Sequence, residues 1–130
     1  MKKHGVLNSA LSGLIASLGH TDLLVVADAG LPIPPGVPVI DLAVRCSVPT
    51  FEDVLAVVAG EMQVERIVIA SEVQQTGDPL PEVANLFAGI PVITCPHEEF
   101  KQRTARARAV VRTGECTPYH NVILQAGVIF

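Results

Sequence analysis

The chain has 130 residues, of which 49% are hydrophobic, and this proportion is sufficient for one domain with a well-filled core. Its formal net charge of −4 and its few aromatic residues, four Phe and one Tyr, argue against a nucleic-acid-binding function. Such a function needs basic residues to neutralise phosphates and aromatic rings to stack on bases. The cysteines, Cys46, Cys95 and Cys116, are odd in number and far apart, which predicts buried free thiols, no disulfide framework and a reducing compartment.

The N-terminal region is predicted to form an amphipathic helix. Leu and Ile residues recur at helical spacing from Leu7 to Leu18, Asn8 or Ser9 can cap the start, and Gly19 suits a left-handed residue at the end. The basic start is similar to that of a signal peptide, but the periodicity indicates a helix of the mature protein. No apolar run approaches the roughly 20 residues that cross a bilayer. We therefore expect a soluble, cytoplasmic protein that does not associate with membranes.

Short apolar strands and helices alternate along the rest of the chain. Buried strands are predicted over 23–27, 39–44, 66–70, 91–95, 109–112 and 122–124. Pro- and Gly-containing loops are predicted over 30–38 and 74–81. Thr50 and Asp53 form an approximate capping box for a helix, and further helices are predicted around 82–87 and from Pro96 to about Thr104. The apolar face of the Thr50 helix comprises Phe51, Val54, Leu55, Val57, Val58 and Met62. This alternation predicts a single α/β domain over residues 1–130, with a largely parallel central sheet flanked by helices.

Several common catalytic and cofactor-binding motifs are absent from the sequence. It contains neither of the glycine-rich phosphate-binding motifs and no G-x-S-x-G nucleophile elbow. The segment HEEFK (97–101) has lysine where a zinc-protease helix requires a second histidine. The remaining inventory of four histidines, one tyrosine and a few carboxylates fits proton transfer without a metal ion or an organic cofactor.

Two histidines stand at predicted helix ends. His20 follows a helix C-terminus, where the helix dipole favours a cation, and a simple capping role explains this position as well as catalysis does. His97 lies in the first turn after Pro96, where the dipole favours a neutral ring that can orient a ligand. A solvent-facing histidine is the alternative for His97.

Further candidates lie at strand ends and in turns. Asp28 follows a buried strand, at the carboxyl end where α/β sheets bind ligands, although an aspartate there also stabilises turns. Tyr119, His120 and Asn121 lie in a Pro-containing turn, and their hydroxyl and amide groups suit a polyol. Turn stabilisation would explain Asn121 equally well.

The sequence resembles the RbsD/FucU family, to which ribose pyranases belong, essentially from end to end. The similar segments are KKHGVLNS (2–9), LGHTD (18–22), ADAGLP (27–32), EMQVE (61–65), HEEFK (97–101), RTGECTPY (112–119) and ILQAGVIF (123–130). The resemblance implies a cofactor-independent isomerase that interconverts the β-pyranose and β-furanose forms of D-ribose in a homodecameric ring. It also implies that His20 is the proton donor and that Asp28, His97, Tyr119 and Asn121 hold the sugar. His120 departs from the family pattern, in which a small residue is expected, and we include it among the sugar-binding candidates.

The predicted strand 23–27 separates His20 from Asp28. An extended segment of this length spans roughly 16–20 Å, which is too far for both residues to contact one pentose. We therefore expect each site to combine His20 of one subunit with the sugar-binding residues of its neighbour. The alternatives are a fucose mutarotase of the same family and a non-catalytic sugar-binding partner of ribose uptake, in which His20 would have no role in sugar exchange.

Overall fold

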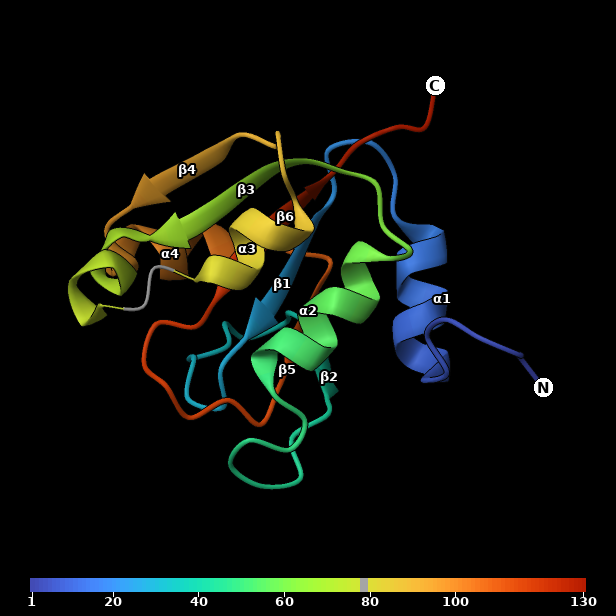
Figure 1. Cartoon of the computed structure of the whole chain (residues 1–130), viewed down its shortest axis with the longest axis horizontal. Coiled ribbons are helices and arrows are strands. Elements are labelled where there is room, and N and C mark those ends of the chain that lie inside the picture. The colour runs from blue at the N-terminus through green and yellow to red at the C-terminus, as the bar shows by residue number, and fades with distance from the viewer. Residues whose placement is uncertain (78–79) are drawn as a thin grey trace.

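A computed structural model describes residues 1–77 and 80–130 and contains a six-stranded sheet (Figure 1). The strands lie in the order β2-β5-β1-β6-β3-β4. Their bounds are β1 Leu23–Ala27, β2 Val39–Asp41, β3 Val64–Ala70, β4 Val92–Cys95, β5 Ala109–Arg112 and β6 Val122–Ala126.

One strand of the sheet, β6, runs against all the others. It is antiparallel to its neighbours β1 and β3, whereas β1 with β5, β2 with β5 and β3 with β4 are parallel pairs. The prediction of a largely parallel sheet is therefore confirmed. The reversal of β6 places its start at the sheet edge where β1, β4 and β5 end. Its end lies at the opposite edge, where β1 and β3 begin.

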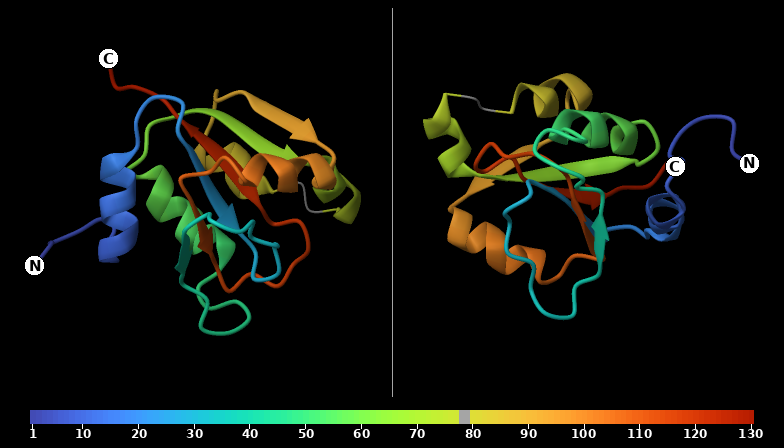
Figure 2. Two further views of the ribbon diagram at one scale, coloured as in Figure 1. Left: turned by 180° about the vertical axis from the view of Figure 1, so that it is seen from behind. Right: turned by 90° about the horizontal axis from the view of Figure 1, so that it is seen from below.

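Helices cover both faces of the sheet. They are α1 Ser9–Ser17, α2 Phe51–Ala59, the 3₁₀ helix η1 Ser71–Thr76, α3 Pro81–Leu86 and α4 His97–Thr104. The right-hand view of Figure 2 shows α2, α3 and η1 on one face and α4 on the other. Strand β1 is buried between these layers. Leu24 and Val26 pack in the core cluster on the α2 side, and Val25 and Ala27 pack in the cluster on the α4 side.

The predicted helix starts are confirmed, but the end of the first helix is not where we expected it. The Asn8 side chain caps α1, and Thr50 with Asp53 forms a full capping box on α2. Helix α1 ends at Ser17, and the left-handed residue that follows is Thr21, with φ of 70°, rather than Gly19. Contacts outside the helix set this turn. The Asp22 carboxylate accepts a hydrogen bond from the Gly19 N–H, and the Thr21 N–H donates to the Ala126 carbonyl on β6.

Several burial and length predictions were wrong. Strands β2 and β4 lie at the two edges of the sheet, so Val39 is 45%, Val92 is 45% and Ile93 is 37% exposed. Val57 on α2, which was predicted to be buried, is 43% exposed. Strand β2 ends at Asp41 instead of continuing to residue 44, because the Asp41 carboxylate accepts a hydrogen bond from the Ala43 N–H and turns the chain. Periodicity does not reveal which strands lie at an edge. The loop predicted over 74–81 begins inside η1, and its residues 78–79 lie outside the described residues.

The expectation of three free thiols was also wrong. Cys46 and Cys116 form a disulfide across 70 positions of the sequence, and only Cys95 is a buried free cysteine, with its thiol pKa raised by burial. The two bonded residues meet because β2 and β5 are neighbours and the segments that follow these strands lie together. Gly114 ties these segments, since its carbonyl accepts from the Ser47 N–H and its N–H donates to the Pro49 carbonyl. The cysteines therefore do not indicate a reducing compartment.

Candidate active site

A cavity of about 530 Å³ opens at the sheet edge where β1, β4 and β5 end and β6 begins. It is lined by residues 28–32, His97, residues 115–119 and Asn121. Four of the five residues predicted to contact the sugar, Asp28, His97, Tyr119 and Asn121, are thus brought together from three distant parts of the chain. Their meeting follows from the reversed β6, which delivers Asn121 to the edge where the parallel strands end.

Asp28 and Asn121 form a buried, doubly hydrogen-bonded pair. The Asp28 N–H donates to Asn121 Oδ1, and Asn121 Nδ2 donates to Asp28 Oδ2, both at 2.8 Å. The other carboxylate oxygen of Asp28 accepts from the Gly30 N–H at 2.9 Å, so Asp28 also has the turn-forming role considered above. Asp28 is 8% and Asn121 is 1% exposed. These contacts hold the carboxylate rigidly at the cavity wall, where it can accept hydrogen bonds from hydroxyl groups.

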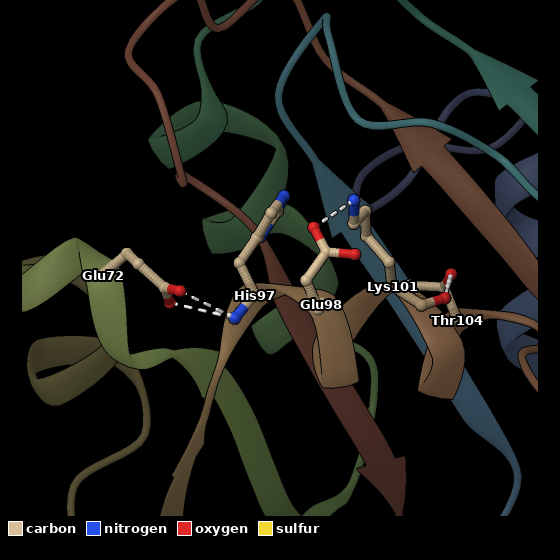
Figure 3. A network of polar contacts seen from close by, with 5 residues as sticks. All are labelled: Glu72, His97, Glu98, Lys101 and Thr104. Atoms are coloured by element: carbon tan, nitrogen blue, oxygen red, sulfur yellow. Dashed lines mark hydrogen bonds and ion pairs between the residues drawn. The ribbon is translucent and has the colours of Figure 1, made fainter.

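His97 is fixed at the first turn of α4 (Figure 3). Its backbone N–H donates to both carboxylate oxygens of Glu72 at 3.0 Å, and this hydrogen bond is the main cause of the lowered pKa of Glu72. The ring points away from Glu72, stacks on Phe100 and meets the ring of Tyr119 edge-on at a centroid distance of 5.1 Å. Its buried Nδ1 has no hydrogen-bond partner among the described residues.

Glu115 organises the cavity wall that follows β5. Its carboxylate accepts from the N–H of Thr117 at 3.0 Å and from the hydroxyl of Thr117 at 2.8 Å, and its carbonyl accepts from the Ala29 N–H. Burial raises the pKa of Glu115, but the hydrogen bonds from Thr117 and Phe51 outweigh this and lower the pKa overall. Tyr119 has a left-handed backbone, with φ of 66°, and its carbonyl accepts from the Asn121 N–H.

Sequence reasoning did not single out Glu72 or Glu115. Glu72 comes shortly after the buried strand β3, the same signal that identified Asp28, and that signal would have found it. Glu115 follows the buried strand β5 in the same way, but its contacts to Ala29 and Phe51 join segments far apart in the sequence and gave no local signal.

His120 and Lys101 do not line the cavity. His120 is 3% exposed and its ring packs edge-on against Phe51, at a centroid distance of 5.9 Å. It supports the turn of Tyr119 and Asn121 from the protein interior instead of facing the cavity. Lys101 forms an ion pair with Glu98 at 2.6 Å on the surface of α4 (Figure 3).

His20 lies at the opposite edge of the sheet, in a separate hollow next to the end of α1 and the C-terminal residues. Strand β1 occupies all of 23–27, so the expected separation of His20 from Asp28 by an extended segment is confirmed. The His20 side chain is 53% exposed and its Nε2 lies 2.9 Å from Glu65 Oε2. Within one chain, the predicted proton donor and the predicted sugar-binding residues therefore lie at opposite edges of the sheet.

Within residues 1–77 and 80–130, no helix combines the length and the apolar character needed to cross a bilayer. In the same part of the chain, no three His, Cys, Asp or Glu side chains are grouped so that they could hold a metal ion.

The sequence and the structure were compared with known proteins. Residues 1–129 match the model of the RbsD / FucU transport protein family. The chain is 54% identical to the D-ribose pyranases of Bacillus velezensis and of Laribacter hongkongensis, in each case over the full length of both proteins. Among solved structures, Bacillus subtilis RbsD complexed with D-ribose gives a TM-score of 0.95 at 51% identity, with both chains fully covered. A fucose mutarotase from Streptococcus pneumoniae in complex with L-fucose shares the fold, with a TM-score of 0.78 at 23% identity over 99% of this chain and 100% of the other.

Proposed function

Because the chain belongs to the RbsD/FucU family, we propose that it is an isomerase that interconverts the pyranose and furanose forms of D-ribose. The observation that carries the proposal is the convergence of Asp28, His97, Tyr119 and Asn121 on one cavity. The full-length identity of 54% to D-ribose pyranases supports ribose as the substrate. The fucose mutarotase is far less similar, at 23% identity, so its likeness bears on the fold alone.

The reaction requires proton transfers at two oxygens of the sugar. The anomeric hydroxyl loses its proton to water, the bond between C1 and the ring oxygen breaks, and the ring oxygen gains a proton from a general acid. The open-chain aldehyde is then attacked by a different hydroxyl, which returns its proton to that acid while the aldehyde oxygen is protonated by water. Histidine suits this exchange because it gains and loses a proton near neutral pH, and such help gives about 10²–10⁴-fold acceleration.

The cavity residues supply the hydrogen bonds that hold the sugar. The carboxylate of Asp28 accepts from sugar hydroxyls, and Asn121 keeps it oriented through their two mutual hydrogen bonds. The Tyr119 hydroxyl and the imidazole of His97 complete the set of polar groups. Their rings are held by mutual edge-on contact and by Phe100, so little ordering is needed when the sugar binds.

We infer that His20 reaches the sugar from a neighbouring subunit. Two partial sites at opposite edges of one chain become complete when the His20 edge of one copy meets the cavity of the next. Such contacts are head-to-tail, and head-to-tail contacts close into rings when the rotation between copies permits. The ring of ten subunits that the family resemblance implies is our proposal for the active form. Exposed apolar residues beside His20, Ile129 at 88% and Phe130 at 100%, fit a surface that another copy covers. A cytoplasmic location stays a prediction of the sequence.

NMR exchange spectroscopy on equilibrated D-ribose tests the function directly. We expect the wild-type protein to accelerate exchange between the pyranose and furanose signals, with little effect on L-fucose. His20→Ala should abolish the acceleration while the protein stays folded. Unchanged ribose exchange with the wild-type protein would refute the proposal. Acceleration that survives in His20→Ala would refute the assignment of the proton donor.

A further inference from the structure

The turn that carries His20 is held in one conformation by four contacts. The Asp22 carboxylate accepts from the Gly19 N–H at 2.8 Å and pairs with Arg108 at 3.3 Å. The Thr21 N–H donates to the Ala126 carbonyl, and the Ala126 N–H donates to the Asp22 carbonyl. Thr21 adopts a φ of 70°, which a β-branched residue does only where the surroundings impose it. These contacts therefore hold the backbone of His20 in one defined position, as a functional residue requires.

The imidazole ring of His20 is fixed by a second set of contacts. Nε2 of His20 lies 2.9 Å from Glu65 Oε2, and the other oxygen of the same carboxylate accepts from Gln125 Nε2 at 2.6 Å. Glu65 and Gln125 lie beside each other on β3 and β6, and the end of β6 also anchors the His20 turn. Gly127 lies against Glu65, since a Cβ added there would be 3.1 Å from Glu65 Cβ. The carboxylate is thus held by two hydrogen-bonding partners, and the base of the side chain lies close to Gly127.

The carboxyl group of Glu65 is ionised at neutral pH, where the imidazole of His20 needs a hydrogen-bond acceptor. Its pKa is lowered, first by the hydrogen bond with His20 and further by the one with Gln125. A carboxylate can only accept hydrogen bonds, so Nε2 of His20 must carry a hydrogen. This contact leaves Nδ1 as the nitrogen that exchanges a proton.

We propose that Glu65 is a positioning residue that fixes the tautomer and the direction of the His20 ring, so that Nδ1 is the atom that exchanges the proton with the sugar. Gln125 keeps the Glu65 carboxylate in place. This inference rests on the proposed role of His20 as proton donor. In ring opening, the proton on Nδ1 moves to the ring oxygen as the C1–O bond breaks. In ring closure, Nδ1 takes the proton of the attacking hydroxyl, and Nε2 stays bonded to Glu65 throughout.

The test compares Glu65→Ala and Glu65→Gln with the wild-type protein. The matched control is Glu52→Gln, which changes an exposed glutamate on α2. We expect kcat for ribose exchange to fall about tenfold in Glu65→Ala, within the roughly 10²–10⁴-fold range that the whole proton transfer supplies. Ribose affinity should stay unchanged, because Glu65 does not line the sugar cavity. The amide of Glu65→Gln can still accept from Nε2, so this variant should recover part of the activity. Glu52→Gln should match the wild type.

Nitrogen NMR of selectively labelled histidine gives a readout that is independent of activity. The His20 signals, assigned by their loss in His20→Ala, should show the Nε2–H tautomer in the wild type and a mixture of tautomers in Glu65→Ala. Wild-type kcat together with an unchanged tautomer in Glu65→Ala would overturn the inference while leaving the proton donor in place. Loss of activity that coincides with dissociation of the assembly, measured by sedimentation, would assign Glu65 to the interface instead. Full activity of His20→Ala would instead refute the assignment of His20 as proton donor, on which the inference rests.

Discussion

Removal of the Cys46–Cys116 disulfide should cost a substantial part of the stability of the chain. The bond joins residues 70 positions apart and is the covalent link between the segment after β2 and the cavity wall after β5. In the chain-entropy relation, a closed loop of that length corresponds to about 4.4 kcal/mol at 25 °C, and native disulfides commonly contribute about 2–5 kcal/mol. Hydrogen bonds of Gly114 to Ser47 and Pro49 remain in the reduced protein and preserve the local fold. We therefore expect a loss of roughly 2–4 kcal/mol in the free energy of unfolding.

Chemical denaturation of the Cys46→Ser/Cys116→Ser variant measures this loss. Wild type and variant are compared at the same protein concentration, because assembly makes apparent stability depend on concentration. A thiol reductant should lower the stability of the wild type to that of the variant and leave the variant unchanged. Thiol titration of the denatured, unreduced wild type should find Cys95 alone. A titration that finds three thiols, or a difference below about 1 kcal/mol with the bond shown to be present, would refute the reasoning.

Three further predictions concern the cavity and its assembly. Asn121→Ala leaves the N–H and one carboxylate oxygen of Asp28 without their partner, so chemical denaturation should show a loss of roughly 1–3 kcal/mol and calorimetry should show weaker ribose binding. The pKa of Glu115 is lowered below its ordinary value of 4.5. The ionised Glu115 carboxylate therefore stabilises the fold fully above pH 4.5, and this stabilisation disappears as the pH falls through the folded-state pKa. The stability difference between the wild type and Glu115→Gln should therefore shrink on acidification, and a difference independent of pH would contradict this. Mixing His20→Ala with Asp28→Ala subunits should restore part of the ribose exchange through hybrid sites, and no recovery in verified mixed assemblies would exclude sites shared between subunits.

The sequence by itself determined the class of the fold and most of the cavity residues. Apolar runs of strand length alternating with helical periodicity give an α/β sheet, because each element must bury its apolar face against another layer. Asp28 was identified because it directly follows a buried strand, where side chains reach the carboxyl edge of the sheet, and His97 because it lies in the first turn of a predicted helix. Caps are equally local, and the Thr50–Asp53 capping box is present as predicted.

The tertiary structure alone decided the contacts between distant segments. The antiparallel insertion of β6 between β1 and β3 brings Asn121 to Asp28 and Gln125 to Glu65, and no local pattern encodes that order of strands. The same holds for the Cys46–Cys116 bond, since thiols far apart in sequence pair only when the topology of the sheet joins their loops. Exposure of β4 likewise depends on its place at the sheet edge. Local sequence sets the conformation of each segment, whereas the pairing of segments depends on the packing free energy of the whole chain.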